Sequence, residues 1–205
     1  MHRSAVRHLK RSDPKLAAII ERVGPCRFET RSEGTHFDAV ARAIVYQQLS
    51  TKAASTILSR FHGLYGARTP TPDELLSTPL EILRSVGLSR QKSAYLYDLA
   101  ARTKSGALPI DALQDLEDSE IITALTGVKG VGRWTAQMFL MFRLGRPDVF
   151  PDLDLGVRKA VQLAYGMRKM PTPLQLAVLA ARWSPHCTIS SWYLWRSLEL
   201  PKRDK

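Results

Sequence analysis

The chain has few cysteines, no long apolar run and a shortage of acidic residues. Its two cysteines, Cys26 and Cys187, are far apart and lack ligand spacing, which excludes a four-cysteine iron–sulfur cluster within the chain and argues against a zinc finger. No stretch approaches the roughly 18 apolar residues of a membrane span, and the N-terminus lacks the apolar core of a signal peptide. We therefore expect a protein of the cytoplasm (the bacterial nucleoid) or the nucleus, neither secreted nor membrane-bound.

The charge balance indicates the class of partner. Thirty Lys and Arg against nineteen Asp and Glu give the 205 residues a net charge of +11. Such a charge fits a polyanion, although charge alone does not distinguish DNA from RNA or an anionic membrane. Residues 1–15 hold five of the basic residues, with Leu9, Leu16 and Ile19 nearby. We expect these basic residues to cover one face of a helix; a targeting signal is the alternative.

Apolar residues recur at helical spacing almost throughout, whereas alternating strand patterns are nearly absent. The predicted helices are 37–49, 51–64, 89–102, 155–165, 174–183 and 187–198. Proline and glycine punctuate the segments between them. The sequence predicts an all-α fold with short connections.

Residues 119–144 have the pattern of a helix-hairpin-helix. The short apolar-periodic segment 119–125 is followed by Gly127, Gly130 and Gly132 and by a second helical run, 134–144. Glycines permit positive φ angles and close backbone approach. The N–H groups that begin the second helix form an anion site suited to a phosphate, to which Lys129 and Arg133 add charge. The alternative is an ordinary helical corner stopped by glycines.

Downstream, the segment from Phe150 to Arg158 places Asp154 directly before the next predicted helix. An acid in that position is often only an N-cap. A backbone-gripping hairpin with a carboxylate nearby instead indicates an enzyme that acts on DNA, and one residue can serve both purposes.

Four segments together resemble the helix-hairpin-helix DNA glycosylases, most closely the 3-methyladenine DNA glycosylase II branch, which repairs alkylated bases. They are Ile44-Val-Tyr-Gln-Gln-Leu-Ser-Thr-Lys-Ala-Ala54, the Gly127–Gln137 hairpin, Val149-Phe-Pro-Asp-Leu-Asp-Leu-Gly-Val-Arg158 and Trp192-Tyr-Leu-Trp195. The resemblance implies one module over residues 1–205 made of two helical lobes flanking a cleft. Residues of about 40–140 would form the central lobe, and the N-terminal segment and about 145–205 the other. It also implies the compact form, without an N-terminal β domain.

The resemblance implies that Asp154 is the catalytic residue of an enzyme that flips a damaged nucleotide out of the duplex. Asp152 is the competing carboxylate, for which we expect a capping or supporting role. Related bifunctional enzymes carry a lysine at the position of Trp134, so its absence predicts a monofunctional glycosylase that leaves an abasic site and an uncut strand.

The predicted base pocket contains Trp134, Trp195, Met138 and Tyr46, and its aromatic faces suit a cationic alkylated purine. The alternative for each is a core position, which is what we expect for Trp183 and Trp192. Tyr46 replaces the glycine usual in the family, so the family's substrate range does not transfer directly.

Two adjacent glutamines on an otherwise apolar helix, Gln47 and Gln48, are costly unless they meet a partner. In the family this segment enters the minor groove, and the position of Gln48 fills the gap left by the flipped base. The predicted DNA-binding residues are Gln47, Gln48, Ser50, Lys52, Lys129, Gly130, Gly132, Arg133 and Thr135.

No catalytic cofactor is predicted, because the five histidines are scattered and no His/Cys/Asp cluster has ligand spacing. The resemblance implies a structural Na⁺ or K⁺ held by the main-chain carbonyls of Thr126, Val128 and Val131. We expect a monomer that binds double-stranded DNA and hydrolytically excises alkylated purines such as 3-methyladenine. The alternatives are a glycosylase for a deaminated or mismatched base and a non-catalytic helix-hairpin-helix DNA-binding module.

Overall fold

A computed structural model describes residues 2–201, and every regular element in that range is a helix. The predicted all-α class is confirmed. The chain divides into two compact units: unit 1 combines residues 1–31 with 140–205, and unit 2 comprises residues 32–139. None of the helices described is long and apolar enough to cross a membrane.

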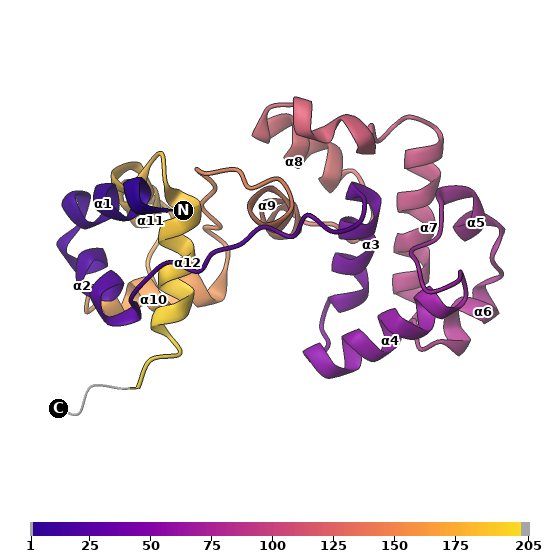
Figure 1. The fold of residues 1–205 in the computed structure, drawn as a ribbon, viewed down its shortest axis with the longest axis horizontal. Helices are drawn as coiled ribbons and strands as arrows, with labels where there is room; N and C mark the ends of the chain where they lie inside the picture. Colours follow the sequence, from indigo (N-terminus) through magenta and orange to yellow (C-terminus); the bar gives the residue numbers. More distant parts are fainter. Residues whose placement is uncertain (1, 202–205) are drawn as a thin grey trace. The chain divides into compact units, whose positions relative to one another are not determined.

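Unit 2 is organised around its longest helix, α7. Its elements are α3 (His36–Tyr46), α4 (Thr51–Gly63), α5 (Pro72–Ser77), α6 (Leu80–Ser85), α7 (Arg90–Lys104), the 3-10 helix η1 (Ile110–Asp115), α8 (Asp118–Thr126) and most of α9 (Arg133–Phe142). Helix α7 packs against α3, α5 and α6, and α3 also packs against α4 (Figure 1). Ser50 and Ser89 accept N-cap hydrogen bonds at the starts of α4 and α7, which explains why those helices begin where the sequence predicts.

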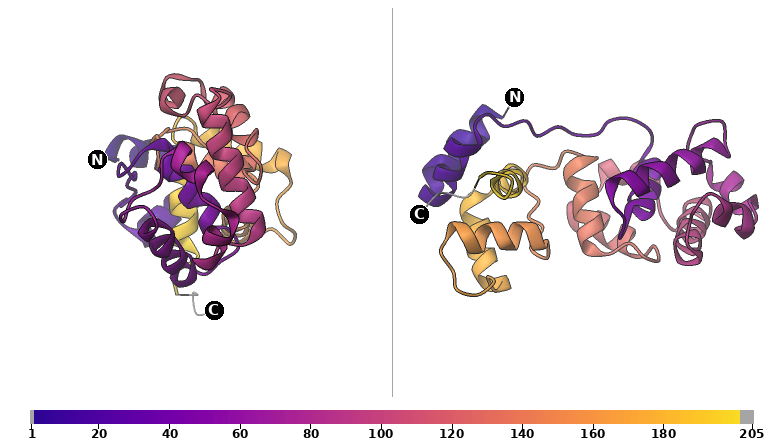
Figure 2. Two further views of the ribbon diagram at one scale, coloured as in Figure 1. Left: turned by 90° about the vertical axis from the view of Figure 1, so that its right-hand side faces the viewer. Right: turned by 90° about the horizontal axis from the view of Figure 1, so that it is seen from below.

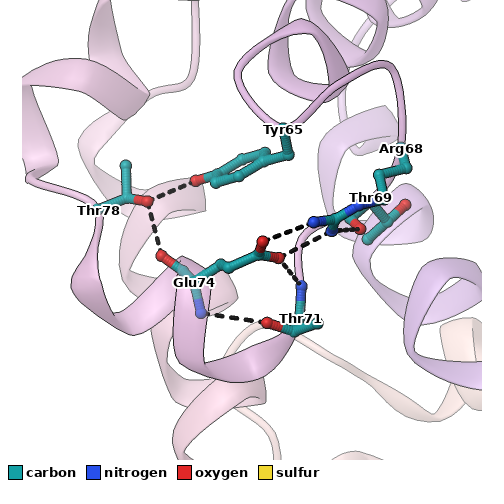
Figure 3. A network of polar contacts seen from close by, with 6 residues as sticks. All are labelled: Tyr65, Arg68, Thr69, Thr71, Glu74 and Thr78. Carbon is teal, nitrogen blue, oxygen red and sulfur yellow. Dashed lines mark hydrogen bonds and ion pairs between the residues drawn. The ribbon is translucent and has the colours of Figure 1, made fainter.

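A polar network fixes the connection from α4 to α5 (Figure 3). Arg68 donates through two nitrogens to the Glu74 carboxylate, at 2.8 and 2.5 Å. Thr78 bridges from the other side, since its hydroxyl donates to the Glu74 carbonyl at 2.8 Å and lies 2.7 Å from the Tyr65 hydroxyl. The Arg68 guanidinium lowers the pKa of Glu74 to about 2. These hydrogen bonds therefore hold the connection between α4 and α5 from both sides, although the Arg68–Glu74 ion pair is exposed.

In unit 1, helix α12 runs through the core. The helices of this unit are α1 (Arg3–Ser12), α2 (Pro14–Val23), α10 (Leu155–Ala164), α11 (Pro173–Trp183) and α12 (Cys187–Ser197), joined by the last residues of α9. Helix α12 packs against α1, α2, α10 and α11, and the right-hand view of Figure 2 shows α10 and α12 crossing. The core includes Leu9, Leu16, Val161, Trp183 and Tyr193.

The basic N-terminal segment forms two helices, not the single helix that we expected. Asp13 breaks it: its backbone is extended, and its Oδ1 accepts the amides of Lys15 and Leu16 at 2.9 and 3.1 Å, so it caps α2. Its Oδ2 accepts the Trp183 indole N–H at 3.0 Å and the Tyr165 hydroxyl. Asp13 is 1% exposed. A buried carboxylate with these partners joins α2 to α10 and α11, which composition did not indicate.

Candidate functional site

Asp154 is held by two hydrogen bonds to one oxygen. It is the N-cap of α10, where its Oδ1 accepts the Val157 amide at 2.8 Å. The same oxygen accepts the Trp195 indole N–H at 2.8 Å. Both the capping role and a fixed, half-buried carboxylate are therefore present in one residue. The two donors fix the orientation of the carboxyl group.

Trp195 therefore has a role that sequence reasoning missed. It was predicted as a base-pocket aromatic; in unit 1 its indole donates to Asp154 and stacks on Phe142, with ring centroids 6.0 Å apart. Phe142 in turn packs against Phe28, with ring centroids 5.4 Å apart. This aromatic row sets the position of the indole N–H and thereby the position of the carboxylate. Whether Trp195 also contacts a base stays a prediction.

Gly156 makes the contact between Trp195 and Asp154 possible. A Cβ at this position would lie 3.0 Å from Asp154 Oδ1 and 3.1 Å from Trp195 Cδ1, closer than nearly all real contacts. The sequence shows only that a glycine occupies the first turn of a predicted helix. The structure shows why the residue is small: a side chain there would collide with Trp195 of α12.

We expect Gly156→Ala to slow catalysis without unfolding the protein. The new methyl group pushes Trp195 away from Asp154. Alanine also stabilises a helix by up to about 1 kcal/mol relative to glycine, so the fold itself should not suffer. The rate of base release should fall by about tenfold, the equivalent of one charge-assisted hydrogen bond, while the melting temperature changes little. Gly63→Ala is the matched control, since nothing lies within 4 Å of a Cβ there. Equal rates in the two variants would contradict the role of Gly156.

Two leucines flank the carboxylate and are unusually exposed. Leu153 is 55% exposed and Leu155 is 70% exposed. Asp152 lies in the turn before them, with its amide bonded to the Phe150 carbonyl at 3.0 Å. Asp154, and not Asp152, is the residue that caps α10. Asp154 is thus flanked by two apolar side chains that are not buried in the core.

The hairpin loop, residues 127–132, joins α8 to α9, and the buried side chains of Val128 and Val131 anchor it. The three glycines were expected to permit positive φ angles and close backbone approach, and they differ in which of these they use. Only Gly130 has a positive φ, of 79°; Gly127 has a φ of −64° and ends α8, and Gly132 is not among the positive-φ glycines. Apart from its two neighbours in the sequence, none of the residues that the structure describes lies within 4 Å of a Cβ at Gly132, so the space beside it is open.

The segment with the two glutamines is a turn and not part of a helix, which corrects the predicted helix 37–49. Helix α3 ends at Tyr46, and α4 begins at Thr51 after the N-cap Ser50. Gln48 has a φ of 55°, the left-handed conformation that costs a non-glycine residue energy. Residues 47–50, the wedge turn, therefore present Gln48 at an exposed, strained position.

The wedge turn and the hairpin loop are bonded to each other. Gln47 Nε2 donates to the Gly130 carbonyl oxygen at 2.8 Å. Lys92 Nζ donates to the Val45 carbonyl at 2.6 Å, in the last turn of α3, and burial lowers the pKa of Lys92. Two segments more than 80 residues apart in the sequence are thus joined in one unit.

The remaining site residues of unit 2 lie mostly at the surface. Trp134 is 44% exposed in the first turn of α9, and half-buried Met138 follows one turn later on the same face. Tyr46 is covered by Arg42, whose guanidinium lies 4.6 Å from the ring centroid. Lys52, Lys129, Gly130, Gly132 and Arg133 are exposed, and Thr135 is half-buried.

Asp98 on α7 is a carboxylate at the hairpin that the sequence did not indicate. Its Oδ2 accepts the Lys129 amide and the Arg102 Nε, both at 2.9 Å, and Lys129 Nζ lies 3.8 Å from Oδ1. Burial raises the pKa of Asp98, but the Lys129 amide and the Arg102 guanidinium outweigh it and hold that pKa below its ordinary value.

The main-chain carbonyls that the sequence predicts as ligands of Na⁺ or K⁺ lie at the end of α8 and in the hairpin loop. Among Thr126, Val128 and Val131, the Val128 carbonyl accepts the Val131 amide at 3.0 Å and retains a second lone pair. Oxygen donors of a short loop suit Na⁺ or K⁺. In residues 2–201 no group of three or more His, Cys, Asp or Glu side chains is arranged to hold a metal ion.

An all-helical chain with a helix-hairpin-helix and a fixed carboxylate at a helix N-terminus defines a class of DNA-processing protein. Residues 41–186 match the family described as "HhH-GPD superfamily base excision DNA repair protein", and the chain belongs to that superfamily.

Relatives and solved structures resemble nearly the whole chain. DNA-3-methyladenine glycosylase 1 of Schizosaccharomyces pombe is 34% identical over 196 residues, which cover 94% of this chain and 86% of the relative. A structure of the S. pombe 3-methyladenine DNA glycosylase in complex with abasic DNA superposes with a TM-score of 0.84 at 33% identity, covering 98% of this chain and 100% of that one. The DNA-3-methyladenine glycosidase of Bacillus halodurans superposes with a TM-score of 0.83 at 34% identity, covering 93% and 87%.

Proposed function

We propose that this chain is a DNA glycosylase that excises alkylated purines, including 3-methyladenine, in base excision repair. The observation that carries the proposal is the Asp154 carboxylate, fixed by the Val157 amide and the Trp195 indole. The resemblance to 3-methyladenine glycosylases over almost the full length supports the substrate class.

The proposed reaction breaks the bond between the sugar C1′ and the base nitrogen, and the electron pair leaves with the base. The nucleotide must first be flipped out of the stack. As the bond breaks, positive charge develops on the sugar, as in the oxocarbenium-like states of glycoside hydrolysis. The Asp154 carboxylate stabilises this charge and accepts a proton from the water that adds to C1′. An N3- or N7-alkylated purine is already cationic, so the leaving group needs little help from an acid.

We further propose that the enzyme is monofunctional. A combined glycosylase and lyase needs an amine that attacks the sugar, and the first turn of α9 carries Trp134 where related bifunctional enzymes carry a lysine. Water is then the nucleophile, and the product is an abasic site in an uncut strand.

Trp134 is proposed to recognise the positive charge of the damaged base. We expect Trp134→Ala to reduce excision of a cationic methylated purine by about 2- to 30-fold, the range that corresponds to one cation–π interaction. Excision of a neutral lesion such as hypoxanthine should change less. Single-turnover rates on the two substrates test this, with Trp134→Phe as the variant that retains an aromatic face. An equal loss on both substrates would contradict a charge-specific role.

The exposed loops of unit 2 are proposed to hold the DNA. Gln48 would fill the gap left by the flipped base. The hairpin loop and the start of α9 would bind a backbone phosphate, with charge from Lys129 and Arg133. A monovalent cation on the carbonyls of Thr126, Val128 and Val131 would bridge to that phosphate. We expect the protein to act as a monomer.

The test is release of free bases from methylated duplex DNA in the presence of a chelator. The proposal predicts methylated purines in solution and strands that break only on alkaline treatment. Borohydride should trap no covalent complex; a trapped complex would contradict the monofunctional mechanism. Salt-sensitive DNA binding without base release would instead favour another lesion or a non-catalytic binding role.

A further inference from the structure

Residues of α7 contact both the hairpin loop and the end of α3, which precedes the wedge turn. Gln91, Tyr95, Asp98 and Arg102 follow one another at spacings of three or four residues, so they share one face of the helix. Lys92 lies beside them and bonds to the end of α3. Each of these residues bonds to, or packs against, a loop or another member of the row.

Asp98 fixes the hairpin loop at Lys129. Its Oδ2 accepts the main-chain N–H of Lys129, and the Arg102 Nε, one turn further along α7, donates to the same oxygen. The carboxylate side chain is 16% exposed, whereas that of Lys129 is 71% exposed. The Arg102 guanidinium also reaches Gly127, since it lies 3.5 Å from a Cβ built there. The first half of the loop is therefore held through its backbone.

Tyr95 fixes the loop at its next residue. A Cβ at Gly130 would lie 2.1 Å from the Tyr95 ring, so the ring lies directly against the Gly130 backbone. The Gln91 amide donates to the Tyr95 hydroxyl. On the other side, the Gly130 carbonyl accepts the Gln47 amide of the wedge turn. Gly130 thus contacts α7 through Tyr95 and the wedge turn through Gln47.

The electrostatics of Asp98 argue for a positional role. A carboxylate beside a phosphate-binding loop repels a polyanion, and a chain of net charge +11 has no evident use for it there. Its bond to a backbone amide explains its presence, because main-chain donors bind a phosphate well only when the loop that presents them is fixed.

We propose that Asp98 is a positioning residue that fixes the hairpin loop for DNA binding, and that Gln47 acts through this same loop and not by touching DNA. The inference rests on the proposed function, since DNA is the ligand whose binding the loop would serve. It reassigns Gln47, which the sequence placed among the DNA-contacting residues.

The first test asks whether removal of the Asp98 carboxylate weakens or strengthens the affinity for DNA. Removing a negative charge strengthens binding to a polyanion if only electrostatics matter. We expect Asp98→Ala to weaken binding to duplex DNA with an abasic-site analogue by about tenfold, the equivalent of one hydrogen bond to a charged acceptor. Asp98→Asn, which still accepts the Lys129 amide, should retain most of the affinity. The rate of base release at saturating DNA should stay near that of the wild type. Asp73→Ala removes an exposed carboxylate of the same unit and is the charge-matched control.

The second test is a double-mutant cycle between Gln47→Ala and Asp98→Ala. Residues that act through one loop give non-additive effects, so the double variant should bind only slightly more weakly than the worse single variant. Gln48→Gly, which keeps the left-handed backbone, should be additive with Asp98→Ala. Additive effects for Gln47, or an Asp98→Ala variant that binds as tightly as the wild type, would overturn the inference.

Hydrogen exchange without DNA separates this inference from the proposed function. Amides of residues 127–132 should exchange faster in Asp98→Ala and in Gln47→Ala, while those of α10 stay unchanged. Unchanged exchange in the loop would overturn the inference even where the wild type binds and repairs DNA. A wild type that binds no DNA would contradict the proposed function, and the exchange rates would still decide whether Asp98 fixes the loop.

Discussion

Replacement of Asp154 by asparagine is expected to lower the rate of base release by about a thousandfold. A carboxylate about 4 Å from a unit positive charge is worth roughly 4 kcal/mol at an effective dielectric of 20, which corresponds to about three powers of ten in rate. The asparagine side chain has nearly the same shape but no charge. Single-turnover release of methylated purines under saturating enzyme measures the effect.

The Asp154→Asn variant should stay folded and bind DNA. Asparagine is as good an N-cap as aspartate, and its carbonyl oxygen still accepts the Val157 amide and the Trp195 indole. Asp152→Asn is the matched control and should lose little activity. A variant of Asp154 that retains most of its rate, or a greater loss from Asp152, would exclude Asp154 as the catalytic carboxylate.

Replacement of Asp13 by alanine is expected to destabilise unit 1 by about 3–5 kcal/mol, the combined cost of a lost N-cap and of two buried donors left without an acceptor. The donors are the Trp183 indole and the Tyr165 hydroxyl, and Asp13 is almost fully buried. Burial and the neighbouring Asp13 carboxylate both raise the pKa of Tyr165, which keeps its hydroxyl protonated and able to donate. Urea unfolding, followed by tryptophan fluorescence, measures the loss.

Asp13→Asn separates the two contributions. The asparagine caps α2 through its carbonyl oxygen as well as aspartate does, but its Nδ2 then replaces the oxygen that faces Trp183 and Tyr165, and an NH2 group accepts a hydrogen bond from neither. Its free energy of unfolding should lie between those of the wild type and Asp13→Ala. A change below about 0.5 kcal/mol for Asp13→Ala, the size of an ordinary surface substitution, would show that the buried network does not stabilise the unit.

Most of the longer helices were predictable because their signals are local, whereas the short helices α5 and α6 were not predicted. Apolar periodicity marked the longer helices, and side-chain caps such as Ser50 and Ser89 set their first residues. The wedge turn escaped the same reasoning: Ile44 and Leu49 continue the helical spacing, and only the observed backbone shows that α3 ends at Tyr46. Hydrophobic periodicity misplaced the end of the helix because Leu49 continues the apolar spacing, although it lies in the turn and is 39% exposed.

The site was predictable only where its residues are close in the sequence. Asp154 could be found because the segment around it resembles a family motif. The contacts that hold it and the hairpin in place join distant residues: Trp195 is 41 positions from Asp154, and Asp98 is 31 from Lys129. No local pattern distinguishes Asp98 from an ordinary solvated acid of a charged helix, since its partner is a backbone amide that any residue would supply.

The left-handed backbone of Gln48 has a thermodynamic consequence for recognition. A flexible loop that becomes ordered only on contact with DNA loses conformational entropy at that moment, and its affinity falls accordingly. Here the strained φ of 55° is adopted in the protein alone, between the Lys92 bond to Val45 and the Gln47 bond to Gly130. The conformational entropy of this turn is therefore lost when the protein folds and not when it binds DNA. In the role proposed for Gln48, filling the gap left by the flipped base, the turn would therefore meet the DNA already in its left-handed conformation.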